Sequence, residues 1–377
     1  MSKIPFNKPA YIPESEILVS QAIKSGHLSG DGEFTRRSSA LLETITGARK
    51  VLLTTSCTHA LEMTAILLDL EEGDEVIVPS FTFVSTVNAI VLRGAKPIFI
   101  DIRPDTLNLD ETQLERLITP KTQAIFVVHY AGVSCEMDVI NRIASRHHIQ
   151  VVEDNAHGLF GQYRGKNLGT LGVMATQSFH ETKNISTGEG GALLINDPQY
   201  IERAEIIREK GTNRSRFFRG AVDKYTWVDI GSSYLPSEMI TAILLAQLEA
   251  RDRIQARRIK VWSTYFQELS SWAENAGVQL PHVPDYCQHP GHLFYLLMPT
   301  LDARTRFLDW MKSQEILCVF HYLPLHLSEM GLQLGGRPGD CPVTEDISDR
   351  LVRLPLFYDI TDDEVAQVLT SVKRFKF

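Results

Sequence analysis

Apolar and polar positions alternate in blocks between residues 50 and 200. Short runs rich in Val, Ile, Leu and Phe are separated by stretches with helical spacing, as in 57–70, where Ala60, Met63 and Leu67 can share one face. Continuous apolar runs between helices are typical of parallel strands that are buried on both faces. The pattern predicts an α/β fold with a mostly parallel, seven-stranded sheet between helices. The expected strands lie within 50–56, 72–80, 96–102, 122–130, 149–156, 173–179 and 191–197.

The pattern changes after residue 236. The segment 236–266 is apolar first and charged later, and it predicts one long helix that leads into a second domain. The remainder is shorter and mixed, which indicates a small α+β domain. We therefore expect a large domain over 1–250, with an N-terminal arm over 1–35, and a small domain over 251–377. Within the small domain, strands are expected over 292–298 and 316–326, and a helix over 305–314.

Composition and charge narrow the class of protein. The chain has 377 residues, 44% apolar and 22% charged, as in ordinary soluble globular proteins of one large or two domains. Its net charge of -8 argues against nucleic acid as a partner, because nucleic-acid binding needs a basic face. The start has no apolar signal-peptide core and no run reaches the length of a membrane span, so a cytoplasmic protein without a membrane partner is expected. The five cysteines form no CxxC pair, so neither a disulfide framework nor a metal site is indicated.

Polar residues follow several of the expected strands, where open parallel sheets bind their ligands. Thr55–Thr58 follows the first strand and opens a helix, so its amides and hydroxyls form either an anion cradle or a simple N-cap. Asp154 follows "VVE", and it could also act only as a cap. Phe81 and Phe83 follow the second strand, where they either face a ligand or pack in the core. Ser178 ends the sixth strand, and Lys183 lies in the glycine-rich turn after it.

Common nucleotide and hydrolase motifs are absent. The sequence contains no GxxxxGK[ST], and "GEGGAL" breaks the GxGxxG pattern because Leu193 stands at the last glycine. "HETKN" breaks HExxH, and no GxSxG elbow occurs. A P-loop, a dinucleotide site, a zinc protease and an α/β-hydrolase are therefore not indicated.

One cofactor accounts for the residues at the strand ends. Pyridoxal phosphate needs a lysine for its Schiff base, an acid to keep its pyridine nitrogen protonated, an anion site for its phosphate and a flat group against its ring. Lysine suits the first role because its amine loses its proton when it is desolvated. Asp154, Lys183, the 56–58 turn, Ser178 and Phe83 fill these roles on one expected edge of the sheet. An ordinary solvated loop is the alternative for Lys183 alone.

Several longer stretches carry a resemblance to a known family. The chain resembles the sugar-nucleotide aminotransferases of the DegT/DnrJ type, within fold type I of the pyridoxal-phosphate enzymes. The resemblance covers nearly the whole chain and implies the fold type I transferase fold. The matching stretches are 25–37, 56–63, 79–102, 127–132, 151–172, 178–184, 188–197 and 229–239.

The resemblance implies a role for each candidate site residue. Catalysis would belong to Lys183, which binds the cofactor and moves protons, and to Asp154, which faces the pyridine nitrogen. Relatives take one phosphate contact from an Asn of a second subunit, and this chain has Ser233 at that position, which leaves the contact open. The other implied cofactor contacts are His157 at the ring hydroxyl, Phe83 on the ring, and Thr58, Ser178 and the Cys57 amide at the phosphate.

The resemblance also implies substrates and assembly. The expected donor is L-glutamate, and the expected acceptor is dTDP-4-keto-6-deoxyglucose, in surface-polysaccharide synthesis. The epimer at carbon 4 of the product, galacto or gluco, stays open. A homodimer with shared active sites is expected. A dehydratase of the same fold is one alternative, although relatives that dehydrate carry histidine in place of the lysine. A non-catalytic sensor is another.

Two further features suggest a sugar-nucleotide site. The segment 208–220 gathers five cations beside one acid, Glu209, so Arg214 and Arg219 either bind a diphosphate or belong to a solvated loop. His321 and His326 in "FHYLPLH" either approach the sugar or are structural.

Overall fold

The central sheet has seven strands in the order β1-β9-β8-β5-β4-β2-β3. It is seen in a computed structural model that describes residues 4–376. Strand β9 is antiparallel to both neighbours, and the other adjacent pairs are parallel. The predicted mostly parallel, seven-stranded sheet is confirmed. The strands are β1 Lys50–Thr54, β2 Glu75–Pro79, β3 Lys96–Ile100, β4 Thr122–Val128, β5 Gln150–Asp154, β8 Met174–Ser178 and β9 Gly191–Ile195.

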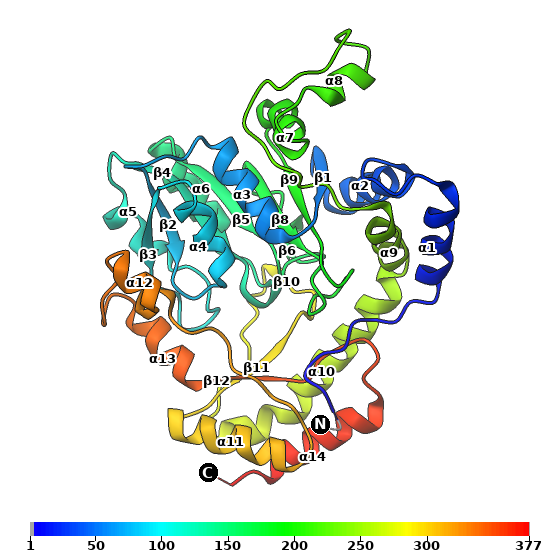
Figure 1. The fold of residues 1–377 in the computed structure, drawn as a ribbon. Coiled ribbons are helices and arrows are strands. Elements are labelled where there is room, and N and C mark those ends of the chain that lie inside the picture. The colour runs from blue at the N-terminus through cyan, green and yellow to red at the C-terminus, as the bar shows by residue number, and fades with distance from the viewer. Residues whose placement is uncertain (1–3, 377) are drawn as a thin grey trace.

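Helices cover both faces of this sheet (Figure 1). On β2, Val76 and Val78 belong to one apolar cluster, whereas Ile77 belongs to another. The same alternation occurs on β4, where Ile125 and Phe126 pack in opposite clusters. Both faces of each strand are therefore buried, which explains the continuous apolar runs in the sequence. The covering helices include α3 Cys57–Leu67, α4 Val84–Val91 and α6 Met137–Arg146.

The central sheet and its covering helices are called the large layer below. Helix α9, Glu238–Glu249, joins the N-terminal residues to it. Helices α1, Glu14–Ser25, and α2, Glu33–Thr46, both pack on α9. The buried carboxylate of Glu238 accepts hydrogen bonds from the amides of Gly32 at 3.1 Å and Phe34 at 2.8 Å. It therefore satisfies free N–H groups at the start of α2, where an acid is also favoured by the helix dipole.

The single long helix expected over 236–266 is wrong. The chain forms α9 and then α10, Arg251–Ala276, with a break at Ala250. At Ala250 φ is -87° and ψ is 2°, so the backbone leaves the α-helical range for one residue before Arg251 begins α10. Helix α10 then enters a second apolar core at Val261. Because the chain passes from one core to another within α10, the structure favours the expected domain boundary near residue 250, which stays a prediction.

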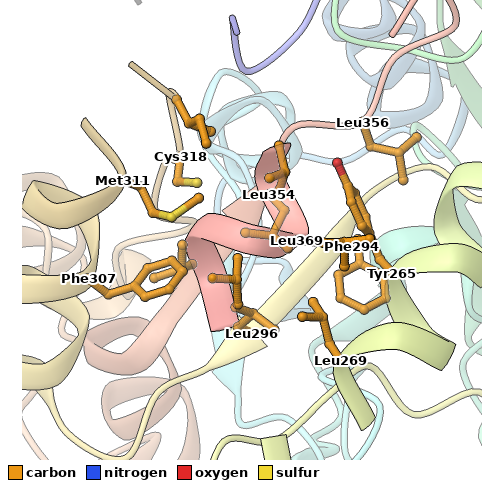
Figure 2. Packing of buried hydrophobic residues seen from close by; sticks show 14 of the residues in the cluster. Tyr265, Leu269, Phe294, Leu296, Phe307, Met311, Cys318, Leu354, Leu356 and Leu369 are labelled. Carbon is orange, nitrogen blue, oxygen red and sulfur yellow. The ribbon is translucent and has the colours of Figure 1, made fainter. Parts of the chain in front are cut away.

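The second core gathers residues from the C-terminal part of the chain around β11, Phe294–Leu297, and β12, Leu351–Leu354 (Figure 2). These two strands are antiparallel and pack with α10, α11, Leu301–Ser313, and α14, Asp362–Arg374. None of the described helices is long and apolar enough to cross a bilayer. The remaining elements include α5 Leu114–Leu117, α7 Ile201–Arg208, α8 Arg214–Phe218, α12 Glu329–Gln333, α13 Pro342–Arg350, β6 Gln162–Tyr163, β7 Lys166–Asn167 and β10 Cys287–Gln288.

The strand expected over 316–326 is wrong. Ile316 and Val319 make only isolated bridges, to Ile4 and Arg353, and a 3-10 turn follows at Leu325–Leu327. Pro324 lacks an N–H group, so it cannot donate to a ladder. The side chains of 319–323 instead line a cavity.

Candidate active site

A cavity of about 850 Å³ lies between the carboxyl ends of the sheet strands and the C-terminal core. Six of the seven strands run in one direction, so their carboxyl ends meet at one edge of the sheet. The structure brings most of the sequence-predicted site residues together in this cavity. They are Cys57, Thr58, Phe83, Asp154, His157, Ser178, Lys183 and His321.

Asp154 ends β5 with its carboxylate buried. Oδ2 accepts a hydrogen bond from Thr86 Oγ1 at 2.7 Å, and Oδ1 accepts one from the Ala156 amide at 3.2 Å. Burial raises the pKa of Asp154 above its ordinary value, and these hydrogen bonds and the nearby Lys183 offset only part of that rise. A cation beside a buried carboxylate is favoured, because its attraction to the negative charge replaces the stabilisation by water that burial removes.

Lys183 lies in the turn between β8 and β9. The turn closes through hydrogen bonds from the Glu181 amide to the Gly188 carbonyl and from the Thr187 amide to the Phe179 carbonyl, both 2.8 Å long. Gly188 has φ 81°, a conformation that glycine adopts without strain. Burial lowers the pKa of Lys183 to about 8, so an uncharged amine is available near neutral pH.

The start of α3 forms a concave, polar wall of the cavity. Ser56 caps the helix by accepting a hydrogen bond from the His59 amide at 3.1 Å, so the N-cap interpretation is correct for this residue. The first-turn amides of Cys57 and Thr58 have no partner within the helix, which suits an anion. A Cβ on Gly191 would clash with the Cys57 amide, so β9 passes tightly behind this wall.

The two aromatic residues after β2 differ in their surroundings. Phe81 is buried against Tyr130 and Tyr322. Phe83 is 58% exposed and lines the cavity. Only Phe83 is therefore free to lie against a flat ligand ring.

Three histidines form a stack beside Lys183. His157 lies 4.3 Å from His292 and 5.9 Å from His321, measured between ring centroids. Burial lowers the pKa of each well below 6.5, so the rings are neutral. His157 Nδ1 accepts a hydrogen bond from the Ala131 amide at 3.3 Å, which leaves the proton on Nε2, 3.4 Å from Tyr322 Oη.

Sequence reasoning missed His292, Tyr322 and Arg353, which also line the cavity. They come from the C-terminal part of the chain, where Tyr322 lies in "FHYLPLH" but only the histidines of that stretch were singled out, and where no motif marked His292 or Arg353. The only local signal was a polar residue within each apolar run.

Four predicted site residues do not line this cavity, and one of them, His326, is fully buried. Its Nδ1 lies 2.6 Å from Ser80 Oγ and its Nε2 lies 3.0 Å from Glu345 Oε1. These contacts join the segment after Pro324 to the sheet, so its position favours the structural interpretation.

Ser233, Arg214 and Arg219 lie on the chain around α7 and α8, which projects from the large layer on the side away from α11 and α14 (Figure 1). Arg214 pairs with Glu209 at 3.2 Å, and Arg219 pairs with Glu205 at 2.8 Å. The positive charges of the segment 208–220 are therefore partly neutralised, because Glu209 and Glu205, a residue of α7, form ion pairs with them.

The cavity's donor set fits pyridoxal phosphate, with an anion site at α3, an acid at Asp154 and a desolvated amine at Lys183. A mostly parallel sheet with these residues at its carboxyl edge defines a pyridoxal-phosphate-dependent aminotransferase of fold type I. Residues 11–373 match the DegT/DnrJ/EryC1/StrS aminotransferase family, and the chain belongs to that family. It is an aminotransferase of that family.

Two curated proteins are similar over most of the chain. An uncharacterized protein from Methanocaldococcus jannaschii, MJ1066, is 34% identical over 351 residues, which cover 91% of this chain and 90% of that protein. The spore coat polysaccharide biosynthesis protein SpsC from Bacillus subtilis is 30% identical over 381 residues, which cover 98% and 96% of the two chains.

Solved structures share the fold. The aminotransferase TlmJ from Streptoalloteichus hindustanus is 27% identical with a TM-score of 0.90, over 99% of this chain and 98% of that one. The pyridoxal-phosphate form of the putative sugar aminotransferase Spr1654 from Streptococcus pneumoniae is 25% identical with a TM-score of 0.90, over 98% and 97% of the two chains.

Proposed function

We propose that this enzyme transfers the amino group of L-glutamate to a nucleotide-linked 4-keto-6-deoxyhexose, with dTDP-4-keto-6-deoxyglucose as the substrate. The product is a dTDP-4-amino-4,6-dideoxyhexose for surface polysaccharide. The observation that carries the proposal is the desolvated amine of the half-buried Lys183 in one cavity with Asp154. The similarity to SpsC supports a role in polysaccharide synthesis.

The cavity residues divide the work of holding the cofactor. The Cys57 amide with the Thr58 and Ser178 hydroxyls would hold the phosphate, Phe83 would pack against the ring, and His157 would contact the ring hydroxyl. When bound, pyridoxal phosphate supplies an electron sink for the carbon that loses a proton. Asp154 would keep the ring nitrogen protonated, because its buried carboxylate stabilises a cation beside it.

Lys183 supplies the proton transfer. Its amine, with a pKa near 8, takes the proton from the donor carbon as a general base and returns one as a general acid. An intact lysine distinguishes this reaction from the dehydration expected of histidine-bearing relatives. It also argues against a non-catalytic sensor.

We also propose a homodimer in which the segment around α8 reaches the partner's cavity. In that arrangement Ser233 contacts the partner's cofactor phosphate, and Arg214 and Arg219 bind the diphosphate of its sugar nucleotide. The segment exposes large apolar side chains, with Phe218 69% and Trp227 76% exposed. Such exposure supports burial against a second copy, in the isologous contact usual for dimers.

The test is product analysis. The purified enzyme with cofactor, L-glutamate and dTDP-4-keto-6-deoxyglucose should give a 4-amino sugar by NMR, and the coupling constants at carbon 4 identify the epimer. A product that has lost a hydroxyl without gaining nitrogen would instead establish dehydration. Cofactor absorbance that does not change with glutamate would favour the sensor.

A further inference from the structure

Residues 4–12, the crossing segment, run from the C-terminal core to the large layer before α1 begins (Figure 1). Ile4 is fully buried in the C-terminal core. Ile12 is buried in the apolar cluster that also contains Phe179 and Ile185, two residues of the turn between β8 and β9. Packing therefore fixes the crossing segment at both ends, one in each core.

Asn7 lies between these fixed ends and lines the cavity. Its Nδ2 donates a hydrogen bond of 2.9 Å to the carbonyl of Glu181, in the turn that carries Lys183. A carbonyl only accepts, so the amide nitrogen of Asn7 and not its oxygen must face the turn. Because the buried ends of the crossing segment already hold Asn7 in place, this bond forms with a smaller loss of conformational entropy than one from a free loop.

The bond from Asn7 reaches a part of the turn that is otherwise held only by local contacts. The Glu181 amide donates to the Gly188 carbonyl at 2.8 Å, within the same turn. Across the described residues 4–376, no other hydrogen bond joins 180–183 to a residue outside 178–190. The two peptide groups that flank Glu181 are therefore held by different partners, the N–H by Gly188 and the C=O by Asn7.

The placement of this turn decides where the Lys183 amine lies. In the proposed function that amine must meet the carbon that loses or gains a proton. Such a transfer needs close alignment, and a misplacement of about 1 Å can lower a rate about a hundredfold. A hydrogen bond that fixes the turn from a distant segment therefore acts on the rate of proton transfer.

We propose that Asn7 is a positioning residue for Lys183, because its hydrogen bond to the Glu181 carbonyl holds the turn that aims the amine. The inference rests on the proposed function. The same amine acts in both halves of the reaction, so loss of the Asn7 donor should slow both halves by the same factor. The affinity for each substrate should be kept, because the Asn7 donor is used on the turn and not on a substrate.

The test compares Asn7→Leu with the matched control Lys8→Leu. Leucine keeps the branched shape of asparagine but has no donor. Lys8 is exposed and makes no hydrogen bond or ion pair with the described residues 4–376. Rapid-mixing absorbance of the cofactor gives a maximal rate and a half-saturating concentration for L-glutamate and, separately, for the keto sugar with the aminated cofactor.

In Asn7→Leu both maximal rates should fall about 3- to 10-fold, as for the loss of one hydrogen bond. Both half-saturating concentrations should stay within about twofold of wild type, and the control should behave as wild type. Unchanged maximal rates in Asn7→Leu would remove the positioning role. Slowing of one half alone, or higher half-saturating concentrations at unchanged maximal rates, would instead assign Asn7 to substrate contact.

Two more variants separate the donor from the shape of the side chain. Asn7→Gln keeps the amide donor on a side chain one methylene longer, so it should recover part of the lost rate. Asn7→Asp keeps the shape but sets a carboxylate against a carbonyl, and because both only accept, its maximal rates should fall at least as far as those of Asn7→Leu. A purely steric role predicts the reverse order, with Asn7→Gln slowest, and that order would overturn the inference.

Melting temperature and cofactor content identify a folding defect in Asn7→Leu, in which case the order of Asn7→Gln and Asn7→Asp decides. A wrong sugar leaves the test intact, because 2-oxoglutarate, the keto product of glutamate, can replace it in the reaction with the aminated cofactor. A wild type inert toward every amino acid, or a Lys183→Ala variant with wild-type rates, refutes the proposed function itself.

Discussion

Lys183 is half-buried, and its amine must be uncharged when it captures the cofactor aldehyde. Burial lowers its pKa from 10.5 to about 8 in the folded protein. Below about pH 8 the folded amine binds a proton and cannot attack, and above it the amine is free. Capture of pyridoxal phosphate by the cofactor-free enzyme should therefore speed up as pH rises through about 8 and level off well below 10.5.

Stopped-flow absorbance measures this rate. Pyridoxamine phosphate is the control, because it has no aldehyde and its binding should not follow the same pH curve. A midpoint near 10 would contradict a desolvated Lys183. The stability of the cofactor-free protein should also rise between about pH 8 and 10.5, since the unfolded chain binds the extra proton across that window.

Asp154 contributes a charge as well as two hydrogen-bond acceptors. Asp154→Asn keeps the size but loses the charge, and because its NH2 group only donates, its single oxygen can keep only one of the two hydrogen bonds from Thr86 and Ala156. Turnover should fall at least about a hundredfold, or about 2.7 kcal/mol of barrier. Thr86→Val is the matched control, because it removes one hydrogen bond to the carboxylate, along with the contact to Thr82 Oγ1, and keeps the charge, and its turnover should fall far less. Wild-type turnover of Asp154→Asn at saturating cofactor would refute the role.

At the scale of elements, the phosphate wall depends on how closely β9 passes behind α3. Gly191→Ala would place a methyl group against the Cys57 amide and the Ser56 carbonyl. Because backbone cannot yield as a side chain does, the start of α3 should shift and the cofactor should dissociate more readily. Absorbance after dialysis measures the cofactor that remains.

Gly188→Ala gives the comparison within the same turn. Its Cβ would meet nothing within 4 Å, although φ is 81°. It should lower the melting temperature through strain at a cost of about 1 kcal/mol, and it should retain more cofactor than Gly191→Ala. Equal retention by both variants would mean that the close approach of β9 does not shape the phosphate site.

At the scale of the whole molecule, the proposed dimer predicts that two different inactive variants should regain activity when their chains form a mixed dimer. A Lys183→Ala chain and an Arg219→Glu chain should each be inactive alone. When they are mixed after reversible dissociation, a mixed dimer holds one site with both native residues. With random pairing, about a quarter of the wild-type activity should return, because half of the dimers are mixed and each has one intact site.

Two different affinity tags on the chains verify that mixed dimers form. Activity that stays absent in verified mixed dimers would refute sharing of Arg219 across the interface. A fully active monomer by sedimentation would refute the dimer itself.

The sequence by itself was enough to predict the central sheet and the two residues at the centre of the candidate site, Asp154 and Lys183. Apolar runs alternating with helical stretches predict strands because side-chain spacing is a local property of the chain. Asp154 and Lys183 could be placed together for a related reason, since parallel strands end at one edge and a residue just after a strand must lie there. These inferences need no knowledge of which distant segments meet.

Tertiary structure alone decided the rest of the site. Local spacing cannot show that Ala250 breaks a helix, that His326 is held between Ser80 and Glu345, or that Arg219 meets Glu205, because each depends on packing between separate elements. Arg353 is the clearest example. The run "LVRL" shows a charge within an apolar strand, but only the packing of β12 between the C-terminal core and the large layer directs that charge toward Lys183.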